Sequence, residues 1–291
     1  MHTKNIEIGR KSYNSILFKN TQNERYGVYI GTASTGLVRM EWAQARFCQT
    51  IPCNWSYNMA TIPIPNCTPI GYLVAEAQNA IVKAFLEGNC EWLFLIEEDN
   101  VLPPHTFLAM NEYMRRKTVP IISGLYFTKS VPAEPMVYRG RGNSYFSDWK
   151  LGDKVWVDAV PTGCVIIHRS IIEVLWNESQ EYLAGTNVWT RRVFHTPENV
   201  KFDPEKGWNN SSGTSDMEFC SRIIVDNIFE KAGWPSFQKK KYPFMVDTNI
   251  FVGHIDKMGI NYPMPQDLKQ FQPIIKPRRL DVRKRREKAY V

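Results

Sequence analysis

The feature of this 291-residue sequence that most restricts its fold is Trp92–Ile96, a run of apolar residues followed at once by three acids. A short apolar run bounded by turn residues is typical of a strand buried on both faces, as in a parallel sheet. Ligands of such sheets bind beyond the carboxyl ends of the strands. The sequence therefore places Glu97, Glu98 and Asp99 at a sheet edge where a ligand can reach them.

The first half of the chain alternates between predicted strands and helices. The expected elements are a strand at 26–31, a helix to about 47, a strand at 59–64, a helix at 73–87, the strand at 92–96, a helix at 103–117 and a strand at 119–124. This order predicts a doubly wound α/β fold. From the first helix Leu37, Met40, Trp42 and Ala45 are expected to face inward, and Gly88 is expected to end the second helix.

The second half is expected to be more antiparallel. Strands are predicted near 136–139, 155–160, 164–168, 243–247 and 250–253, with a short helix at 169–176 and a longer one at 214–231. Ser215 and Glu218 have the spacing of a capping box at the start of the longer helix. Residues 177–213 are rich in Gly, Asn and Ser, and they are predicted to form a long loop that closes over a site.

The positive charge of the chain is concentrated near its C-terminus. The net charge is +7, and the segment Lys276–Lys288 holds eight basic and two acidic residues, so it carries most of that charge. The predicted organisation is an N-terminal extension (1–24), one nearly neutral catalytic domain (25–262, with halves 25–125 and 126–262) and a basic tail (263–291). Such a tail can bind nucleic acid or anionic lipid through charge attraction, and the alternative is a solvated end that aids solubility.

Composition sets further limits on location and chemistry. No segment is long and apolar enough to span a membrane, and the N-terminus lacks an apolar leader, so a soluble, cytoplasmic protein is expected. The cysteines include no C-x-x-C pair, which argues against a zinc ribbon. Free thiols in a reduced compartment are favoured over a metal shared by Cys48, Cys53 and Cys67.

The three acids after the apolar run are candidates for a metal site. Adjacent carboxylates repel one another unless a positive group neutralises them, and their hard oxygens suit Mg²⁺ or Mn²⁺. His254 follows a late strand and is a further candidate ligand, while Asp216 begins the last long helix and is a candidate general base. From the residues alone, a solvated acidic turn, a structural histidine and a helix-stabilising aspartate are open alternatives.

Four stretches of the chain resemble motifs of GT-A-fold glycosyltransferases, especially the family 2-like enzymes. They are Ile96-Glu97-Glu98-Asp99 at the place of a D-x-D motif, Ala75–Val82 for an A-R-N-x-I-V helix, Thr214–Cys220 for an E-D-x-x-F-C motif and Gly253-His254-Ile255 for a closing G-H motif. The similarity covers about residues 26–256. The sequence departs from these motifs at Glu97, Gln78 and Ser215, where the family has Asp, Arg and an acid.

The resemblance implies a GT-A (Rossmann-like) mixed sheet and a metal-dependent, inverting glycosyltransferase. It implies that Asp99 and His254 hold Mn²⁺ or Mg²⁺ and that Asp216 is the catalytic base. The expected donor-binding residues are Thr32, Ala33, Asn79, Glu97, Glu98 and Gly163. The expected donor is a nucleotide sugar, first of all a UDP-sugar, and the acceptor is either a modified DNA base bound with help from the tail, or a glycan, protein or small molecule. An inactive carbohydrate- or nucleic-acid-binding module and a metal-dependent nucleotidyltransferase are the alternatives.

Overall fold

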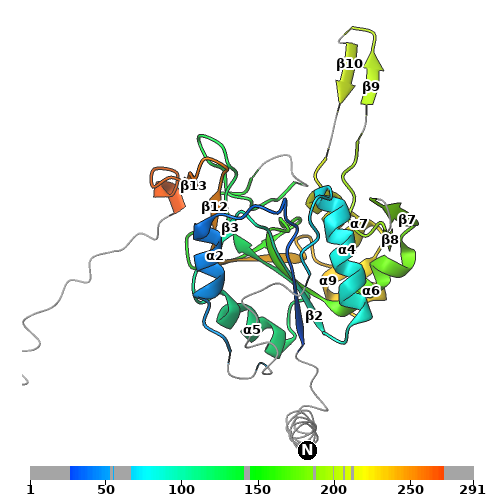
Figure 1. Ribbon diagram of the computed structural model, residues 1–291, viewed down its shortest axis with the longest axis horizontal. Helices are drawn as coiled ribbons and strands as arrows, with labels where there is room; N and C mark the ends of the chain where they lie inside the picture. Colours follow the sequence, from blue (N-terminus) through cyan, green and yellow to red (C-terminus); the bar gives the residue numbers. More distant parts are fainter. Residues whose placement is uncertain are drawn as a thin grey trace, which may run out of the picture.

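A six-stranded mixed sheet with helices on both faces forms the centre of the protein, which we describe from a computed structural model (Figure 1). The described residues are 27–52, 55, 67–140, 145–185, 188–198, 200–205, 207–210 and 213–271. The predicted N-terminal extension, the predicted strand at 59–64 and the basic segment Lys276–Lys288 lie outside them. The division of the chain into domains therefore stays a prediction.

The described secondary structure comprises helices and strands with the following bounds. The strands are β1 (Val28–Gly31), β2 (Trp92–Ile96), β3 (Asn100–Val101), β4 (Ile121–Leu125), β5 (Lys154–Val157), β6 (Cys164–His168), β7 (Glu181–Ala184), β8 (Val188–Arg191), β9 (Val200–Asp203), β10 (Gly207–Asn210), β11 (Phe244–Phe251), β12 (Gly253–Ile255) and β13 (Asn261–Tyr262). The helices are α2 (Met40–Phe47), α4 (Val74–Glu87), α5 (Thr106–Arg116), α6 (Arg169–Glu178), α7 (Ser215–Val225), α8 (Ile228–Lys231), α9 (Pro235–Gln238) and the 3-10 turn η1 (Lys269–Phe271).

The central sheet confirms the predicted mixed α/β fold. Its strand order is β1-β2-β6-β4-β11-β5. β1 pairs with β2 and β4 with β11 in parallel, whereas β6 runs antiparallel to both β2 and β4, and β5 runs antiparallel to β11. The second half of the chain thus inserts β6 between two strands of the first half. β1, β2, β4 and β11 all point the same way, so their carboxyl ends meet at one edge.

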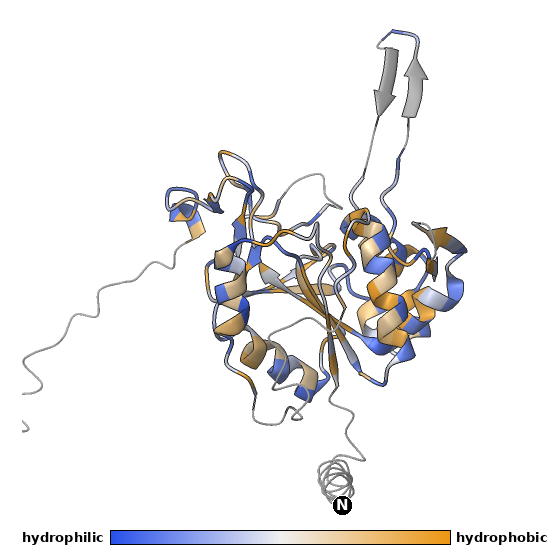
Figure 2. Cartoon of the chain, viewed as in Figure 1, coloured by the Kyte–Doolittle hydropathy of each residue, from blue (hydrophilic) through white to orange (hydrophobic). Residues whose placement is uncertain are grey.

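Two helical layers cover the sheet. In Figure 1, α2 and α5 lie on one side of the sheet and α4, α6 and α7 on the other. The sheet between them is strongly apolar (Figure 2), and every residue of β2 is buried. Close packing of α4 on β1 requires Gly31, because a Cβ there would lie 2.2 Å from the Ile81 side chain. Gly88 ends α4, as the sequence predicts.

Two helix predictions are corrected by the structure. Leu37 and Met40 are 88% and 70% exposed, so of the residues expected to face inward here only Trp42 is buried. The predicted helix at 214–231 is interrupted at Asn227, whose φ of 55° breaks the helix into α7 and α8. Asparagine tolerates this left-handed conformation better than most residues.

The predicted capping box of α7 is also wrong. The N-cap residue is Thr214, one position earlier than expected, and it makes no side-chain cap hydrogen bond. Ser215 instead lies within the first turn, where its hydroxyl donates to Gln78 Oε1 at 3.2 Å. A tertiary hydrogen bond has replaced the local one that the spacing suggested.

Strand predictions in the second half hold only in part. β5 and β6 confirm the strands near 155–160 and 164–168, but near 136–139 the described residues form only isolated bridges at Tyr138. The two strands expected between 243 and 253 are a single strand, β11, with an irregular register between Asp247 and Phe251, followed by β12. The segment 177–213 is not a plain loop, because it contains the hairpins β7–β8 and β9–β10.

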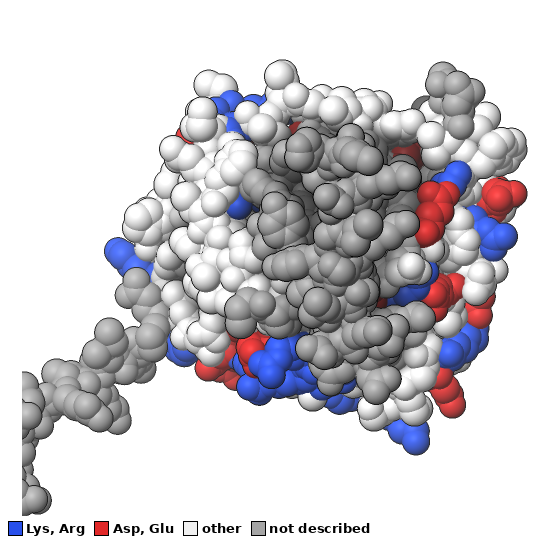
Figure 3. All heavy atoms as spheres, turned by 60° about the horizontal axis from the view of Figure 1, so that its bottom comes forward, with Lys and Arg blue, Asp and Glu red and all other residues white. Residues whose placement is uncertain are grey.

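Charged side chains of both signs lie next to each other on the face in Figure 3, which agrees with a nearly neutral body. None of the helices in the described part of the chain is long and apolar enough to cross a bilayer.

Candidate active site

Five segments meet at the edge where β1, β2, β4 and β11 end. They are Thr32–Thr35 after β1, Glu97–Asp99 after β2, Tyr126–Lys129 after β4, Gly163 just before β6, and His254 in β12. The meeting of these segments follows from the strand directions, because parallel strands deliver their carboxyl ends to one edge.

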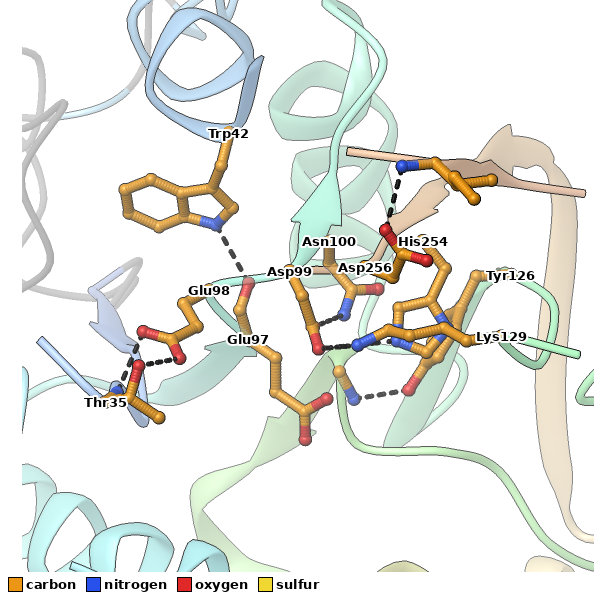
Figure 4. A network of polar contacts seen from close by, with 12 residues as sticks. Thr35, Trp42, Glu97, Glu98, Asp99, Asn100, Tyr126, Lys129, His254 and Asp256 are labelled. Atoms are coloured by element: carbon orange, nitrogen blue, oxygen red, sulfur yellow. Dashed lines mark hydrogen bonds and ion pairs between the residues drawn. The ribbon is translucent and has the colours of Figure 1, made fainter. Parts of the chain in front are cut away.

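The three acids after β2 point in different directions (Figure 4). Glu98 turns toward the loop after β1, where its carboxylate accepts hydrogen bonds from Thr35 N at 2.9 Å and from the hydroxyls of Thr35 and Ser34 at 2.6 and 2.5 Å. Asp99 turns the opposite way, toward Lys129 and His254. Glu98 therefore fixes the loop after β1, and Asp99 is the acid that faces Lys129 and His254.

Asp99 and His254 lie together. The Nε2 atom of His254 is 3.5 Å from Asp99 Oδ2. The proximity follows from strand pairing, because β12 pairs with β3 and places His254 opposite Asn100. His254 Nδ1 lies 2.7 Å from the carbonyl oxygen of Phe127 and donates to it, so Nε2 is the ring nitrogen that faces Asp99.

The electrostatics of Asp99 reflect these neighbours. Burial alone would raise the pKa of Asp99, but the hydrogen bonds and charges of His254 and Lys129 lower it to about 2. Asn100 Nδ2 also donates to Asp99 Oδ1 at 3.0 Å. The carboxyl group is therefore an anion across the physiological pH range.

Glu97 has the opposite character. Its backbone is fixed by Trp42 Nε1, which donates to the Glu97 carbonyl at 2.9 Å, and by its own N–H, which donates to Gly163 O at 2.9 Å. Burial raises the pKa of the Glu97 carboxyl to about 8, and the charges of Asp99 and Asp216 add to that rise. At neutral pH in the ligand-free protein, Glu97 is mostly protonated and can donate a hydrogen bond.

Gly163 lies where a side chain cannot be accommodated. Its N–H donates to the Tyr126 hydroxyl at 2.7 Å, and a Cβ there would lie 2.5 Å from that hydroxyl, 2.7 Å from Asn100 Nδ2 and 2.9 Å from Glu97 Oε2. The loop before β6 therefore presents bare backbone beside the acids.

Asp216 lies close enough to Glu97 and Tyr126 for its charge to affect their pKa values. It is 9% exposed and accepts a hydrogen bond from Met217 N at 2.9 Å. Burial raises the pKa of Asp216, and the Asp216 charge in turn raises the pKa values of Glu97 and Tyr126. A buried carboxylate with a raised pKa is a stronger base than a solvated one.

Gln78 holds the two sides of the site together. Its Nε2 donates to Thr162 Oγ1 at 2.9 Å, and its Oε1 accepts from Ser215 at 3.2 Å. One buried side chain thus links the loop that carries Gly163 to the helix that carries Asp216. The two departures from the family motifs at positions 78 and 215 contact each other, which gives both a structural role.

The remaining predicted donor-binding residues divide into two groups. Thr32 and Ala33 lie on the loop after β1, and the buried Thr32 hydroxyl makes no hydrogen bond within the described chain. The amide of Asn79, in contrast, is used by the backbone of Phe194 at 2.8 and 2.9 Å and by the Tyr182 hydroxyl at 2.9 Å. The Asn79 side chain therefore joins α4 to Tyr182 and Phe194, and its part in donor binding stays a prediction.

The Asp99 carboxylate and the His254 imidazole are the side chains here that could hold a divalent cation. They converge, and Lys129 already brings a cationic group to the same carboxylate oxygen. Nearby, the buried Asn100 Oδ1 makes no hydrogen bond within the described chain. No group of three or more His, Cys, Asp or Glu side chains in the described ranges is arranged to hold a metal ion. An ion held by these two side chains would need further ligands from water or from a bound molecule.

Comparisons with known proteins add a distant likeness. No protein-family model and no curated protein matches the chain. A solved structure titled "Crystal Structure of A197 from STIV" is similar in fold, with 14% sequence identity, a TM-score of 0.48, and coverage of 81% of this chain and 88% of that one. The assignments that follow rest on the residues of this chain.

Several residues that shape the site were not predicted to belong to it. Lys129 contacts Asp99, Tyr126 contacts Gly163, Trp42 contacts Glu97 and Ser34 contacts Glu98. Gln78, which the sequence marked only as a departure from a motif, links Thr162 to Ser215. Lys129 carried a usable signal, because it follows the predicted strand at 119–124 by a few residues and loops at that edge are where ligands bind. The other contacts depend on side-chain directions that a linear pattern does not contain.

A hollow of about 490 Å³ lies elsewhere on the surface. Tyr113, Arg116, Lys154, Trp156 and Lys240 are among its lining residues, and none of the predicted site residues lines it.

Glu218, one turn after the start of α7, provides a test of buried charge near the site. Its side chain is 19% exposed, one carboxylate oxygen lacks a hydrogen bond within the described chain, and burial raises its pKa to about 7 despite Arg222 and Arg192. The folded protein binds the extra proton between pH 4.5 and about 7, so stability falls as the pH rises through that window.

Glu218→Gln should remove this pH dependence. We expect the variant to be about 1–2 kcal/mol more stable than the unmodified protein at pH 8, a value reduced from the full shift because the group is partly solvated. At pH 4.5 the two proteins should have nearly equal free energies of unfolding. Urea denaturation at both pH values checks this, and an equal difference at the two values would contradict the assignment.

Proposed function

We propose that this protein is a glycosyltransferase that moves a sugar from a nucleotide-sugar donor to an acceptor hydroxyl with inversion at the anomeric carbon. The observation that carries the proposal is the convergence of Asp99 and His254, whose Oδ2 and Nε2 atoms are 3.5 Å apart, together with Asp216, whose charge raises the pKa of the neighbouring Glu97. Glu97 and Asp99 follow β2, His254 lies in β12 and Asp216 lies in α7, and in sheets of this kind ligands bind beyond the carboxyl ends of the strands.

In this proposal Asp99 and His254 hold Mn²⁺ or Mg²⁺ beside the donor diphosphate. When bound, such an ion supplies positive charge that neutralises the departing nucleoside diphosphate. Protonated Glu97 donates a hydrogen bond to the donor, and the bare backbone at Gly163 lets the sugar approach. The loop after β1, fixed by Glu98, positions the nucleotide through Thr32 and Ala33.

Asp216 is the base in this proposal. It takes the proton of the acceptor hydroxyl as that oxygen attacks the anomeric carbon. The bond from that carbon to the diphosphate oxygen breaks on the opposite face, and its electron pair stays with the diphosphate. Because Asp216 is buried and its pKa is raised, it accepts this proton more readily than a solvated aspartate. The site supplies positioning and charge neutralisation for the same step.

A thermal-shift screen of nucleotide sugars with and without Mn²⁺ tests the proposal. At a ligand concentration of 100 times Kd, binding stabilises a protein by about 2.7 kcal/mol. For a domain of this size that corresponds to a rise of roughly 5–10 °C in melting temperature. UDP-sugars are the first choice, and the shift should depend on Mn²⁺.

Asp99→Ala should abolish the Mn²⁺-dependent part of that shift, because it removes the anionic ligand. Asp226→Ala is the matched control, since Asp226 lies exposed at the end of α7. No shift with any nucleotide sugar would contradict the proposal and favour a binding module for another ligand. Product analysis separates the remaining alternative, because a nucleotidyltransferase releases pyrophosphate whereas a glycosyltransferase releases nucleoside diphosphate.

The acceptor is either a modified DNA base, bound with help from the basic tail, or a glycan, protein or small molecule. The tail Lys276–Lys288 lies outside the described residues, so the choice rests on its charge alone.

A further inference from the structure

Lys129 brings its ammonium group to the position that a metal ion would share. Its Nζ contacts Asp99 Oδ2, the same oxygen that faces His254 Nε2 (Figure 4). The lysine comes from the segment after β4, Asp99 from the segment after β2, and His254 from β12. Three separate segments therefore converge on one carboxylate oxygen.

Lys129 and Asp99 form an ion pair in the ligand-free protein, so the ammonium group offsets the charge of the carboxylate that faces His254. Without a cation at this place, adjacent carboxyl groups would repel one another.

A divalent ion and an ammonium group cannot both occupy that oxygen closely, because their like charges repel. The Lys129 side chain is 31% exposed and extends from an exposed residue on a long flexible stem, so it is free to move once another cation arrives. The anionic oxygens of a diphosphate held by the same ion would give the displaced ammonium a new partner.

We propose that Lys129 is an exchangeable cation: it holds Asp99 in the ligand-free protein, yields that carboxylate to the divalent ion, and then binds a phosphate oxygen of the nucleotide. This inference rests on the proposed function. It makes Lys129 a direct ligand of the donor diphosphate, and it makes metal binding and lysine movement two parts of one event.

Calorimetry with Mn²⁺ alone, and with UDP in the presence of Mn²⁺, tests the exchange. Lys129→Met keeps the approximate length of the side chain and removes its charge. We expect it to bind Mn²⁺ about tenfold more tightly than the unmodified protein, because the competing cation is gone, and to bind UDP in the presence of Mn²⁺ about tenfold more weakly, because the cation that binds the phosphate oxygen is gone. Lys129→Arg, which keeps the charge, should resemble the unmodified protein in UDP binding.

Lys154→Met is the matched control, since Lys154 lies on β5 with its Nζ 5.0 Å from the Tyr113 ring centre, away from the site residues. It should leave both affinities unchanged. Thermal melting of each variant shows that it is folded.

The outcomes separate the inference from the proposed function. If the unmodified protein binds both Mn²⁺ and UDP but Lys129→Met binds Mn²⁺ no more tightly, the exchange is wrong and the transferase assignment stands. If Lys129→Met alone binds Mn²⁺, the lysine blocks the ion and does not yield to it, and the exchange is wrong. If neither protein binds Mn²⁺ or any nucleotide, the proposed function fails, and the exchange fails with it.

Discussion

Replacing Asp216 with Asn is expected to lower the rate of sugar transfer by roughly 10²–10⁴-fold, the range that a general base contributes. The amide has nearly the same shape as the carboxylate, and its oxygen can still accept the hydrogen bond from Met217 N. It cannot take a proton from the acceptor hydroxyl. We therefore expect the rate of nucleoside diphosphate release, measured at saturating donor and acceptor, to fall by this factor. The affinity for the donor, measured by calorimetry, should stay within a few-fold of that of the unmodified protein.

Asp226→Asn provides the control for Asp216→Asn, because it makes the same chemical change at the exposed end of the same helix. It should leave the transfer rate unchanged. Full activity in Asp216→Asn would assign the base to another group. A large loss of donor affinity in the same variant would instead assign Asp216 to donor binding, which its charge coupling to Glu97 also allows.

Gly163→Ala is expected to damage the site through packing. The new Cβ would lie 2.5 Å from the Tyr126 hydroxyl, 2.7 Å from Asn100 Nδ2 and 2.9 Å from Glu97 Oε2. The backbone cannot easily move away, because Gly163 N donates to Tyr126 and Gly163 O accepts from Glu97 N. Overpacking of this kind destabilises a protein by about 1–3 kcal/mol. We also expect the donor-induced thermal shift to disappear, since the displaced groups line the proposed donor site.

Gly88→Ala is the matched control for Gly163→Ala. Gly88 ends α4 with φ −94°, and its added Cβ would meet only carbonyl oxygens at 3.5 and 3.9 Å, which is ordinary contact. Urea denaturation and the thermal-shift screen should therefore separate the two alanine variants. Equal, small effects would mean that the Gly163 loop relaxes without disturbing the acids.

The order of elements was readable from the sequence wherever burial dictated the pattern. The run Trp92–Ile96 is a strand with every residue buried, and apolar residues at helical spacing mark α4. The prediction failed where the pattern of apolar residues did not match the pattern of buried residues. Leu37 and Met40 are apolar but exposed, and the segment 177–213 formed hairpins because strand pairing there does not depend on a regular apolar period.

The candidate site shows the same division. The resemblance to glycosyltransferase motifs put Asp99 and His254 in one site, and the structure places His254 Nε2 3.5 Å from Asp99 Oδ2, while their role as metal ligands stays a prediction. A resemblance at one position says nothing of what the side chain contacts in the folded chain, and the amide of Asn79 is hydrogen-bonded to the backbone of Phe194. Lys129 was missed, because only its position a few residues after the predicted strand at 119–124 pointed to this edge, and nothing local showed that its side chain reaches Asp99.

By itself, the sequence determined that a buried strand ends in acids at the ligand edge of an α/β sheet, because a run of apolar residues has few other places to fold. Only the tertiary structure decided how those acids divide their roles. Pairing of β3 with β12 brought His254 to Asp99, insertion of β6 put Gly163 against Glu97, and Lys129 reached Asp99 from the end of β4. These contacts join residues far apart in the chain, so they depend on strand order and side-chain direction, which no local pattern encodes.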